Sequence, residues 1–305
     1  MLIIGGATAT GKSGIAVQVA KELNGEIISA DSMQIYKYMD IGTAKVTTKE
    51  KQGIIHHLID IVQPEDNFSV AEFSALAREK ISDIKARNKV PIIVGGTGLY
   101  INSLIYEYKL PNQDLELRNR LKNELESVGK EEMYKKLCLV DPVSASKIHP
   151  NNVKRVLRAL EVYLSSGQSI GEKDDKREFV PHKMFAINID RDMLYQKINA
   201  RVEKMFQSGL VKELEYLLNE RKLNFEMQSM QAIGYKEFRD YFDANNVEIK
   251  LEDVQDIIKQ HTRNYAKRQI TWLKNIPSCQ WLNNEEKQQI IDRICADYSK
   301  YRSNL

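Results

Sequence analysis

The stretch Gly6-Ala7-Thr8-Ala9-Thr10-Gly11-Lys12-Ser13 follows the apolar run Leu2-Ile3-Ile4 after a single glycine. It has the form G-x-x-x-x-G-K-S, which is a phosphate-binding loop when a strand precedes it and a helix follows. Both conditions are met, because apolar residues recur with helical spacing from Ser13 to about Leu23. The glycines let backbone N–H groups turn toward an anion, and the helix N-terminus and Lys12 add positive charge. The stretch therefore predicts an α/β fold with an anion site after its first strand.

The composition describes a globular chain with an ordinary core and a weak overall charge. Among 305 residues, 42% are hydrophobic, and the formal net charge is +3, so any nucleic-acid site must be a local basic patch. Cys138, Cys279 and Cys295 are far apart and form no C-x-x-C pair, which argues against a disulfide framework and a zinc site. No apolar stretch is long enough to span a membrane, and the first strand begins at residue 2. We therefore expect a cytoplasmic protein without a membrane segment or targeting peptide.

A second strand, residues 26–29, ends in Ala30-Asp31-Ser32-Met33-Gln34. In a parallel sheet, Asp31 and Gln34 would emerge at the same edge as the phosphate loop, where ligands bind. A carboxylate beside a phosphate site either holds Mg²⁺ or accepts a proton from a nucleophile. The simpler alternative is that Asp31 only starts a turn.

A third apolar strand, residues 90–94, ends in Gly95-Gly96-Thr97-Gly98. An ordinary phosphate-loop NTPase has a Mg²⁺-binding aspartate at the end of such a strand. The missing acid argues against a motor or signalling NTPase. Thr97 brings a hydroxyl to the same edge, although a plain strand-to-helix turn would also explain this sequence.

Other segments extend the core. Residues 57–62 and 181–190 have strand character, and residues 70–87 have the pattern of a helix capped by Ser69. The last third of the chain has helical patterns. We expect the segment at 181–190 to rejoin the core sheet.

Strand signals disappear in the middle of the chain, where charged helical segments replace them. These segments are 115–128, 131–138 and 153–165. We predict a P-loop NTPase-like core with a parallel sheet flanked by helices, plus an all-helical insertion domain. The core is assigned to residues 1–112 and 181–305, and the insertion to 113–180.

Basic residues occur at three notable places in the helical parts of the chain. Lys154, Arg155 and Arg158 are close together on one helix, and Arg201 lies in the middle of another. Residues 263–272 interleave cations with aromatic rings, a mixture that suits RNA. Each has a simpler explanation: a solvated face for the first cluster, a surface ion pair for Arg201, and core aromatics for the third.

Taken together, these motifs resemble the tRNA dimethylallyltransferase family, also called tRNA isopentenyltransferases or MiaA, in its bacterial form. The resemblance runs nearly end to end, and several ordered motifs make it far more specific than a lone phosphate loop. The matching segments are 6–13, 28–36, 40–45, 94–100, 158–162, 231–237 and 262–269.

The resemblance implies transfer of a dimethylallyl group from dimethylallyl diphosphate to the exocyclic amine of the adenosine 3′ of the anticodon in tRNA. Asp31 and Thr97 would be the catalytic residues, Ser13 would bind the implied cofactor Mg²⁺, and the enzyme would act as a monomer on the anticodon stem-loop. The implied diphosphate site is Gly6, Ala7, Thr8, Ala9, Thr10, Gly11, Lys12, Ser13 and Arg201. The implied tRNA site is Asp31, Ser32, Met33, Gln34, Thr97, Arg118, Lys154, Arg155, Val156, Leu157 and Arg158.

The loop departs slightly from the family pattern. Ala7 replaces the usual proline, and Ser13 replaces threonine but keeps the hydroxyl. The zinc finger of eukaryotic members is absent. Two alternatives remain: an ATP-dependent small-molecule kinase on the same scaffold, which has no use for the basic insertion, and an adenylate isopentenyltransferase acting on free nucleotide.

Overall fold

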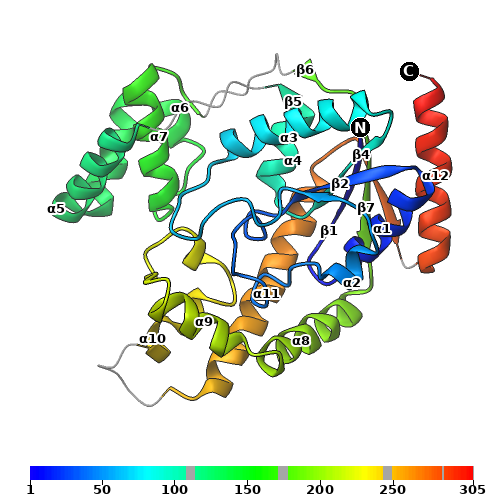
Figure 1. Ribbon diagram of the computed structural model, residues 1–305. Helices are drawn as coiled ribbons and strands as arrows, with labels where there is room; N and C mark the ends of the chain where they lie inside the picture. Colours follow the sequence, from blue (N-terminus) through cyan, green and yellow to red (C-terminus); the bar gives the residue numbers. More distant parts are fainter. Residues whose placement is uncertain (108–113, 171–177, 243–248, 284, 305) are drawn as a thin grey trace. The chain divides into compact units, whose positions relative to one another are not determined.

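The structure, a computed structural model, describes residues 1–107, 114–170, 178–242, 249–283 and 285–304. The chain forms two compact units (Figure 1). Residues 1–105 and 180–305 make up the larger unit, and residues 106–179 the smaller one. The predicted first boundary, between residues 112 and 113, lies outside the described residues.

The larger unit is built on a six-stranded sheet in which every pair of neighbouring strands is parallel. Its order is β3-β2-β4-β1-β7-β8. The strands are β1 (Leu2–Gly6), β2 (Gly25–Ala30), β3 (His56–His57), β4 (Val90–Gly95), β7 (Lys183–Asn188) and β8 (Cys279–Asn283). Because β2, β4 and β1 are adjacent, the segments that follow them emerge side by side at one edge of the sheet.

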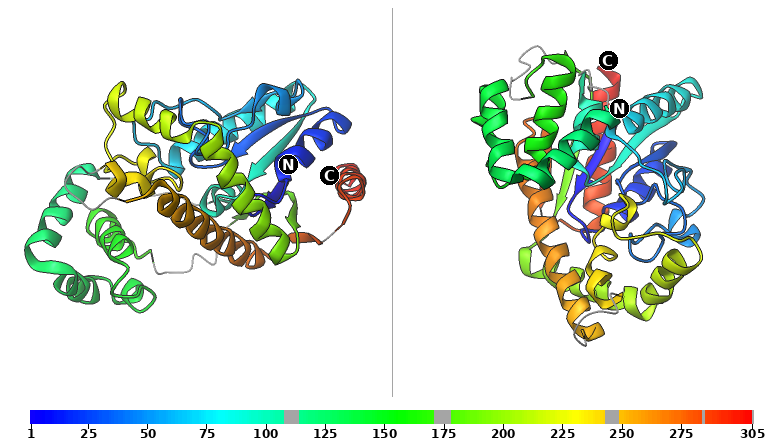
Figure 2. Two further views of the ribbon diagram at one scale, coloured as in Figure 1. Left: turned by 90° about the horizontal axis from the view of Figure 1, so that it is seen from below. Right: turned by 90° about the vertical axis from the view of Figure 1, so that its left-hand side faces the viewer.

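Helices cover both faces of this sheet. On one face, α1 (Lys12–Glu22) and α12 (Lys287–Ser303) pack against alternate strand residues such as Ile4 and Ile92. On the other face lies α11 (Leu251–Lys274), whose Leu273 contacts the sheet at Gly5. Figure 2 shows α11 as one long helix, which brings residues late in the chain back to β1.

The other helices of the larger unit lie around this core (Figure 1). The Ser69 cap of α3 is confirmed, because the Ser69 side chain and Glu72 form a reciprocal capping box. These elements are α2 (Thr48–Lys51), α3 (Val70–Ala86), α4 (Gly98–Ile105), α8 (Arg191–Gln207), α9 (Leu210–Asn219), α10 (Arg239–Phe242) and the 3₁₀ turns η1 (Ser229–Gln231) and η2 (Lys236–Phe238).

Two secondary-structure predictions, one of a strand and one of an entirely helical segment, were wrong. The strand expected at 57–62 is only β3, because Leu58 and Asp60 adopt left-handed φ angles of 60° and 57° and turn the chain away. The chain then bonds to the segment after β2, where Lys37 N–H donates to Val62 O at 2.9 Å. The last third of the chain is not entirely helical either, because it contributes β8 to the sheet edge.

The smaller unit is helical apart from one short antiparallel pair, β5 (Tyr106–Glu107) with β6 (Glu178–Phe179). Its helices are α5 (Leu115–Val140), α6 (Pro142–Ala145) and α7 (Val153–Ser166). Gly129 interrupts α5 with φ 80° and ψ 170°, which matches the two separate helices expected there. No described helix of either unit is long and apolar enough to cross a membrane.

Candidate active site at the carboxyl edge of the sheet

The loop between β1 and α1 has the backbone of an anion-binding turn. Gly11 adopts φ 85° directly before α1, a conformation that side chains disfavour. The Thr10 hydroxyl donates to Ala7 O at 2.9 Å and closes the turn. Neither a capping side chain nor an acid in the first turn occupies the N-terminus of α1. Its N–H groups are therefore available to an anion.

Two partly buried cations converge on this loop. The Lys12 ammonium rests 3.3 Å from Ala7 O, and burial lowers the pKa of Lys12 to about 8. Arg201, from the middle of α8, donates to the Thr8 hydroxyl at 2.8 Å and to Ala44 O at 3.4 Å. Burial also lowers the pKa of Arg201. Both groups have lost solvation that a bound anion would replace.

Asp31 begins the turn after β2 and is held there by its own backbone. Its Oδ1 accepts hydrogen bonds from Met33 N–H at 2.9 Å and Gln34 N–H at 3.4 Å. Thr97, which follows the neighbouring strand β4, accepts from Ser32 N–H at 3.1 Å, while its own N–H donates to Ala30 O at 3.2 Å. The two turns therefore support each other across adjacent strands.

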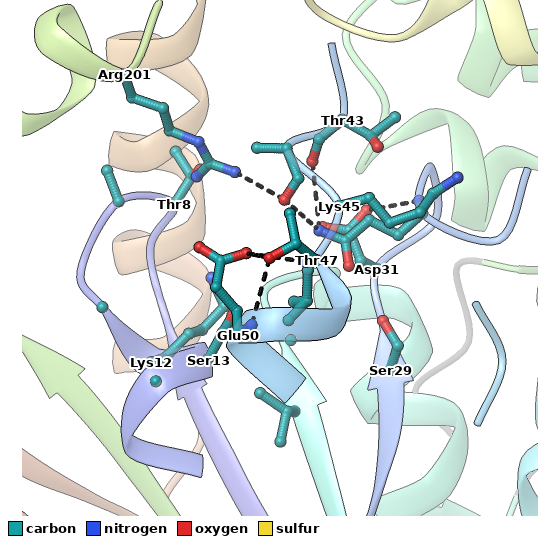
Figure 3. A pocket seen from close by; sticks show the side chains of 18 of the residues that line it. Thr8, Lys12, Ser13, Ser29, Asp31, Thr43, Lys45, Thr47, Glu50 and Arg201 are labelled. Carbon is teal, nitrogen blue, oxygen red and sulfur yellow. Dashed lines mark hydrogen bonds between the residues drawn. The ribbon is translucent and has the colours of Figure 1, made fainter. Parts of the chain in front are cut away.

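Lys12, Ser13, Asp31, Gln34 and Arg201 line one cavity of about 760 Å³. Figure 3 shows Arg201 reaching Thr8 from above, with Lys12 and Ser13 on one side of the view and Asp31 on the other. The cavity also has an apolar part, which is lined by Ile27, Ile59 and Val94. Ser32, Met33 and Thr97 adjoin the Asp31 turn, but they are not among the described residues that line the cavity.

The segment 40–45 forms another wall of the cavity, and a residue far away in the sequence holds its backbone in place. Glu213 on α9 accepts hydrogen bonds from three consecutive N–H groups, those of Asp40, Ile41 and Gly42, at 2.8, 2.8 and 3.0 Å. The side chain of Lys45 is 6% exposed and pairs with both Asp40 and Asp60. Glu213 had no signal in the sequence, because its partners lie more than 170 residues away.

A second distant residue joins the phosphate loop to the end of β4. Gln269 on α11 accepts from Thr8 N–H at 2.8 Å and donates to Gly96 O at 3.0 Å. A Cβ at Gly96 would lie 2.1 Å from the Gln269 amide nitrogen, so only glycine fits there. Tyr265 lines the cavity one turn earlier on α11, and burial raises its pKa to about 12. The aromatic and polar residues of 263–272 thus include parts of the cavity wall.

The donor set suits a magnesium ion that arrives with phosphate. No group of three or more histidine, cysteine or acidic residues that could hold a metal occurs in the described part of the chain. Ser13 offers a hydroxyl at the start of α1 and lines the cavity. Magnesium typically keeps several waters and uses few protein ligands beside substrate phosphates. Ser13 with a diphosphate fits that pattern.

The predicted tRNA residues of the smaller unit lie on α5 and α7. Arg118, Lys154 and Arg155 are exposed, and Arg158 is ion-paired at 2.6 Å with Glu161. Val156 is buried in the core of this unit, and Leu157 packs against that core. Arg118, Lys154 and Arg155 thus lie at the surface of this unit, whereas the predicted tRNA contact Val156 faces inward.

Known proteins are similar to this chain in sequence and in fold. The family model described as IPP transferase matches residues 34–276. A protein of Acetivibrio thermocellus named tRNA dimethylallyltransferase is 48% identical over 292 residues, which cover 94% of this chain and 92% of that protein.

Two solved structures are similar over almost the whole chain. The full-length tRNA isopentenylpyrophosphate transferase of Bacillus halodurans has a TM-score of 0.74 and 41% identity, covering 99% of this chain and 96% of that one. A eukaryotic dimethylallyltransferase, described as acting on tRNA, has a TM-score of 0.85 and 30% identity. That match covers 100% of this chain and 79% of the eukaryotic one.

Proposed function

Because the chain belongs to the IPP transferase family, we propose that this cavity transfers a dimethylallyl group from its diphosphate to an adenosine of tRNA. The observation that carries the proposal is the shared cavity of Lys12, Arg201 and Asp31. Two cations suited to a leaving anion and a carboxylate suited to accept a proton from an amine line this one cavity, which supports the proposal. The chain is therefore an enzyme, a prenyl transferase that acts on tRNA.

The diphosphate occupies the loop at residues 6–13. As the bond between the allyl carbon and the diphosphate oxygen breaks, the bonding electrons leave with the diphosphate. Lys12 and Arg201, which line the cavity, and the uncapped N–H groups of α1 would stabilise the charge that develops there. Mg²⁺, held by Ser13 and the phosphates, would add charge neutralisation.

Asp31 serves as the proton acceptor for the exocyclic amine of the adenosine. That amine is a weak nucleophile, since its lone pair is delocalised into the ring, so loss of its proton helps the new nitrogen–carbon bond to form. Such general base catalysis typically contributes about 10²–10⁴ in rate. Asp31 is oriented by its bonds to Met33 and Gln34, and Thr97 supports the same turn through Ser32.

The remaining predicted residues hold the RNA. The target base, 3′ of the anticodon, must leave its stack to enter a cavity. Gln34 lines that cavity, and because its amide nitrogen already donates to Thr43 O and Ala44 O, its amide oxygen is the group it offers to the base. Lys154 and Arg155, both exposed on α7, would neutralise phosphates of the anticodon stem-loop, together with Arg158 on α7 and Arg118 on α5 of the same unit.

The test is incubation with labelled dimethylallyl diphosphate, Mg²⁺ and either unmodified tRNA or AMP. We expect label in tRNA alone. Asp31→Asn keeps the acceptor for the two backbone N–H groups but removes the base, so turnover should fall about 10²–10⁴-fold while tRNA still binds. Label in AMP, ATP turnover without tRNA, or an undiminished rate for Asp31→Asn would contradict the proposal.

A further inference from the structure

Tyr38 is a bulky residue in a backbone conformation that favours glycine. Its φ angle is 65°, and the side chain is 42% exposed. A left-handed conformation at an aromatic residue is uncommon and persists only when its surroundings hold it. Glycine at this position would adopt the same backbone without that cost. Contacts of the Tyr38 side chain must therefore help to hold this conformation.

Two residues at the end of α9 surround the Tyr38 ring. Tyr216 lies with its ring centroid 6.2 Å away at an interplanar angle of 59°, and it is itself 41% exposed. The Arg221 guanidinium lies 4.9 Å from the Tyr38 ring centroid. Arg221 forms an ion pair with Glu65 at 2.6 Å and donates a hydrogen bond to the Gln63 side chain at 3.2 Å. We call Tyr38, Tyr216 and Arg221 the aromatic patch.

The aromatic patch is joined directly to the cavity. Gln34 and Asp40, on either side of Tyr38 in the chain, both line the cavity. Tyr38 is two residues from Asp40, so their Cα atoms are less than about 7 Å apart. The same helix that carries Tyr216 also fixes the cavity wall through Glu213. The patch thus lies close to a segment of the cavity wall, and both depend on α9.

We propose that the aromatic patch is a stacking site for an unpaired tRNA nucleotide next to the one whose base enters the cavity. The inference rests on the proposed function, because it needs a base to have left the anticodon-loop stack. When that base leaves the stack, the neighbouring base loses the ring against which it was stacked. Exposed tyrosine rings and an arginine plane are the surfaces on which unstacked RNA bases bind, without the need for a particular sequence.

The experiment compares Tyr38→Gly with Tyr38→Phe by measuring the Kd for unmodified tRNA. Tyr38→Gly removes the ring at a position that glycine tolerates, so it should not unfold the protein, and its Kd should rise about 5- to 150-fold. Tyr38→Phe keeps the ring and should bind like the wild type. Asn88→Gly, at another left-handed position with φ 57°, controls for the added glycine.

Two further readouts separate stacking from other roles. Loss of a stack removes no phosphate contact, so the slope of log Kd against log salt should not change, and neither should the KM for dimethylallyl diphosphate. A Kd for Tyr38→Gly within twofold of the wild type would overturn the inference while leaving label transfer by the wild type, and hence the proposed function, intact. If sedimentation instead shows that Tyr38→Gly loses a dimer with no change in tRNA affinity, the patch joins two copies of the chain and the inference is wrong.

Discussion

Raising the pH from 7 to 9 should weaken the binding of a diphosphate, because Lys12 loses its proton in this range. Burial lowers the pKa of Lys12 to about 8; Asp31 opposes this shift and Arg201 adds to it. A bound diphosphate stabilises the ammonium and raises that pKa again. The diphosphate therefore binds preferentially to the protonated form of the free enzyme.

The size of the effect follows from proton linkage. The Kd is multiplied by 1 + 10^(pH − 8), which is about 1.1 at pH 7 and about 11 at pH 9, so affinity falls about tenfold. Tyr265, His56 and Arg201, which also line the cavity, do not account for the effect. The pKa of Tyr265 is raised to about 12, the pKa of His56 is lowered by burial, and the Arg201 guanidinium remains charged.

Calorimetric titration with an unreactive diphosphate analogue, in two buffers of different ionisation enthalpy, measures both Kd and proton uptake. We expect uptake of about 0.5 proton at pH 8 and about 0.9 at pH 9. Lys12→Arg is the matched variant, since a guanidinium keeps its charge and should abolish the uptake. A constant Kd between pH 7 and 9, or equal uptake by Lys12→Arg, would refute the assignment.

Other substitutions test the remaining contacts of the site. Arg201→Lys loses a two-pronged grip on Thr8 and Ala44, so the KM for the diphosphate should rise about 10- to 100-fold in steady-state assays. Gln269→Leu leaves one loop N–H and one strand-end carbonyl unpaired, which should lower the free energy of unfolding in urea by about 2–4 kcal/mol; an unchanged midpoint would contradict this. Reversing the charges of Lys154 and Arg155 should reduce the salt slope of tRNA binding by about 2, and an unaltered slope would place the RNA elsewhere.

The parts of the site that sequence predicts are those specified by consecutive residues. The phosphate loop needs only its own glycines, the preceding strand and the following helix. Asp31 is predicted to lie at the same edge as Lys12, because each residue follows a strand and the two strands are expected to be parallel. The sheet confirms that order, and the two side chains line one cavity.

The parts that sequence could not supply depend on contacts between distant segments. The residues alone allow two roles for Arg201, a surface ion pair or a contact to phosphate. In the structure, α8 brings Arg201 to the hydroxyl of Thr8, 193 residues away in the chain. Gln269 and Glu213 hold backbone groups of loops, and such contacts leave no periodic pattern. The prediction of a strand at 57–62 was wrong because apolar alternation does not reveal the left-handed backbone at Leu58 and Asp60.

The strand order also explains why the acid of this site follows β2 rather than β4. At the end of β4, a Cβ on Gly95 would lie 2.2 Å from Ala30 O, and one on Gly96 would collide with Gln269. An aspartate therefore cannot stand there without displacing the backbone. With β4 between them, β1 and β2 are about 9–10 Å apart, the width of two strand spacings. The glycines keep the side chains of β4 out of this interval, and the Gln269 amide uses the space to join Thr8 of the anion loop to Gly96.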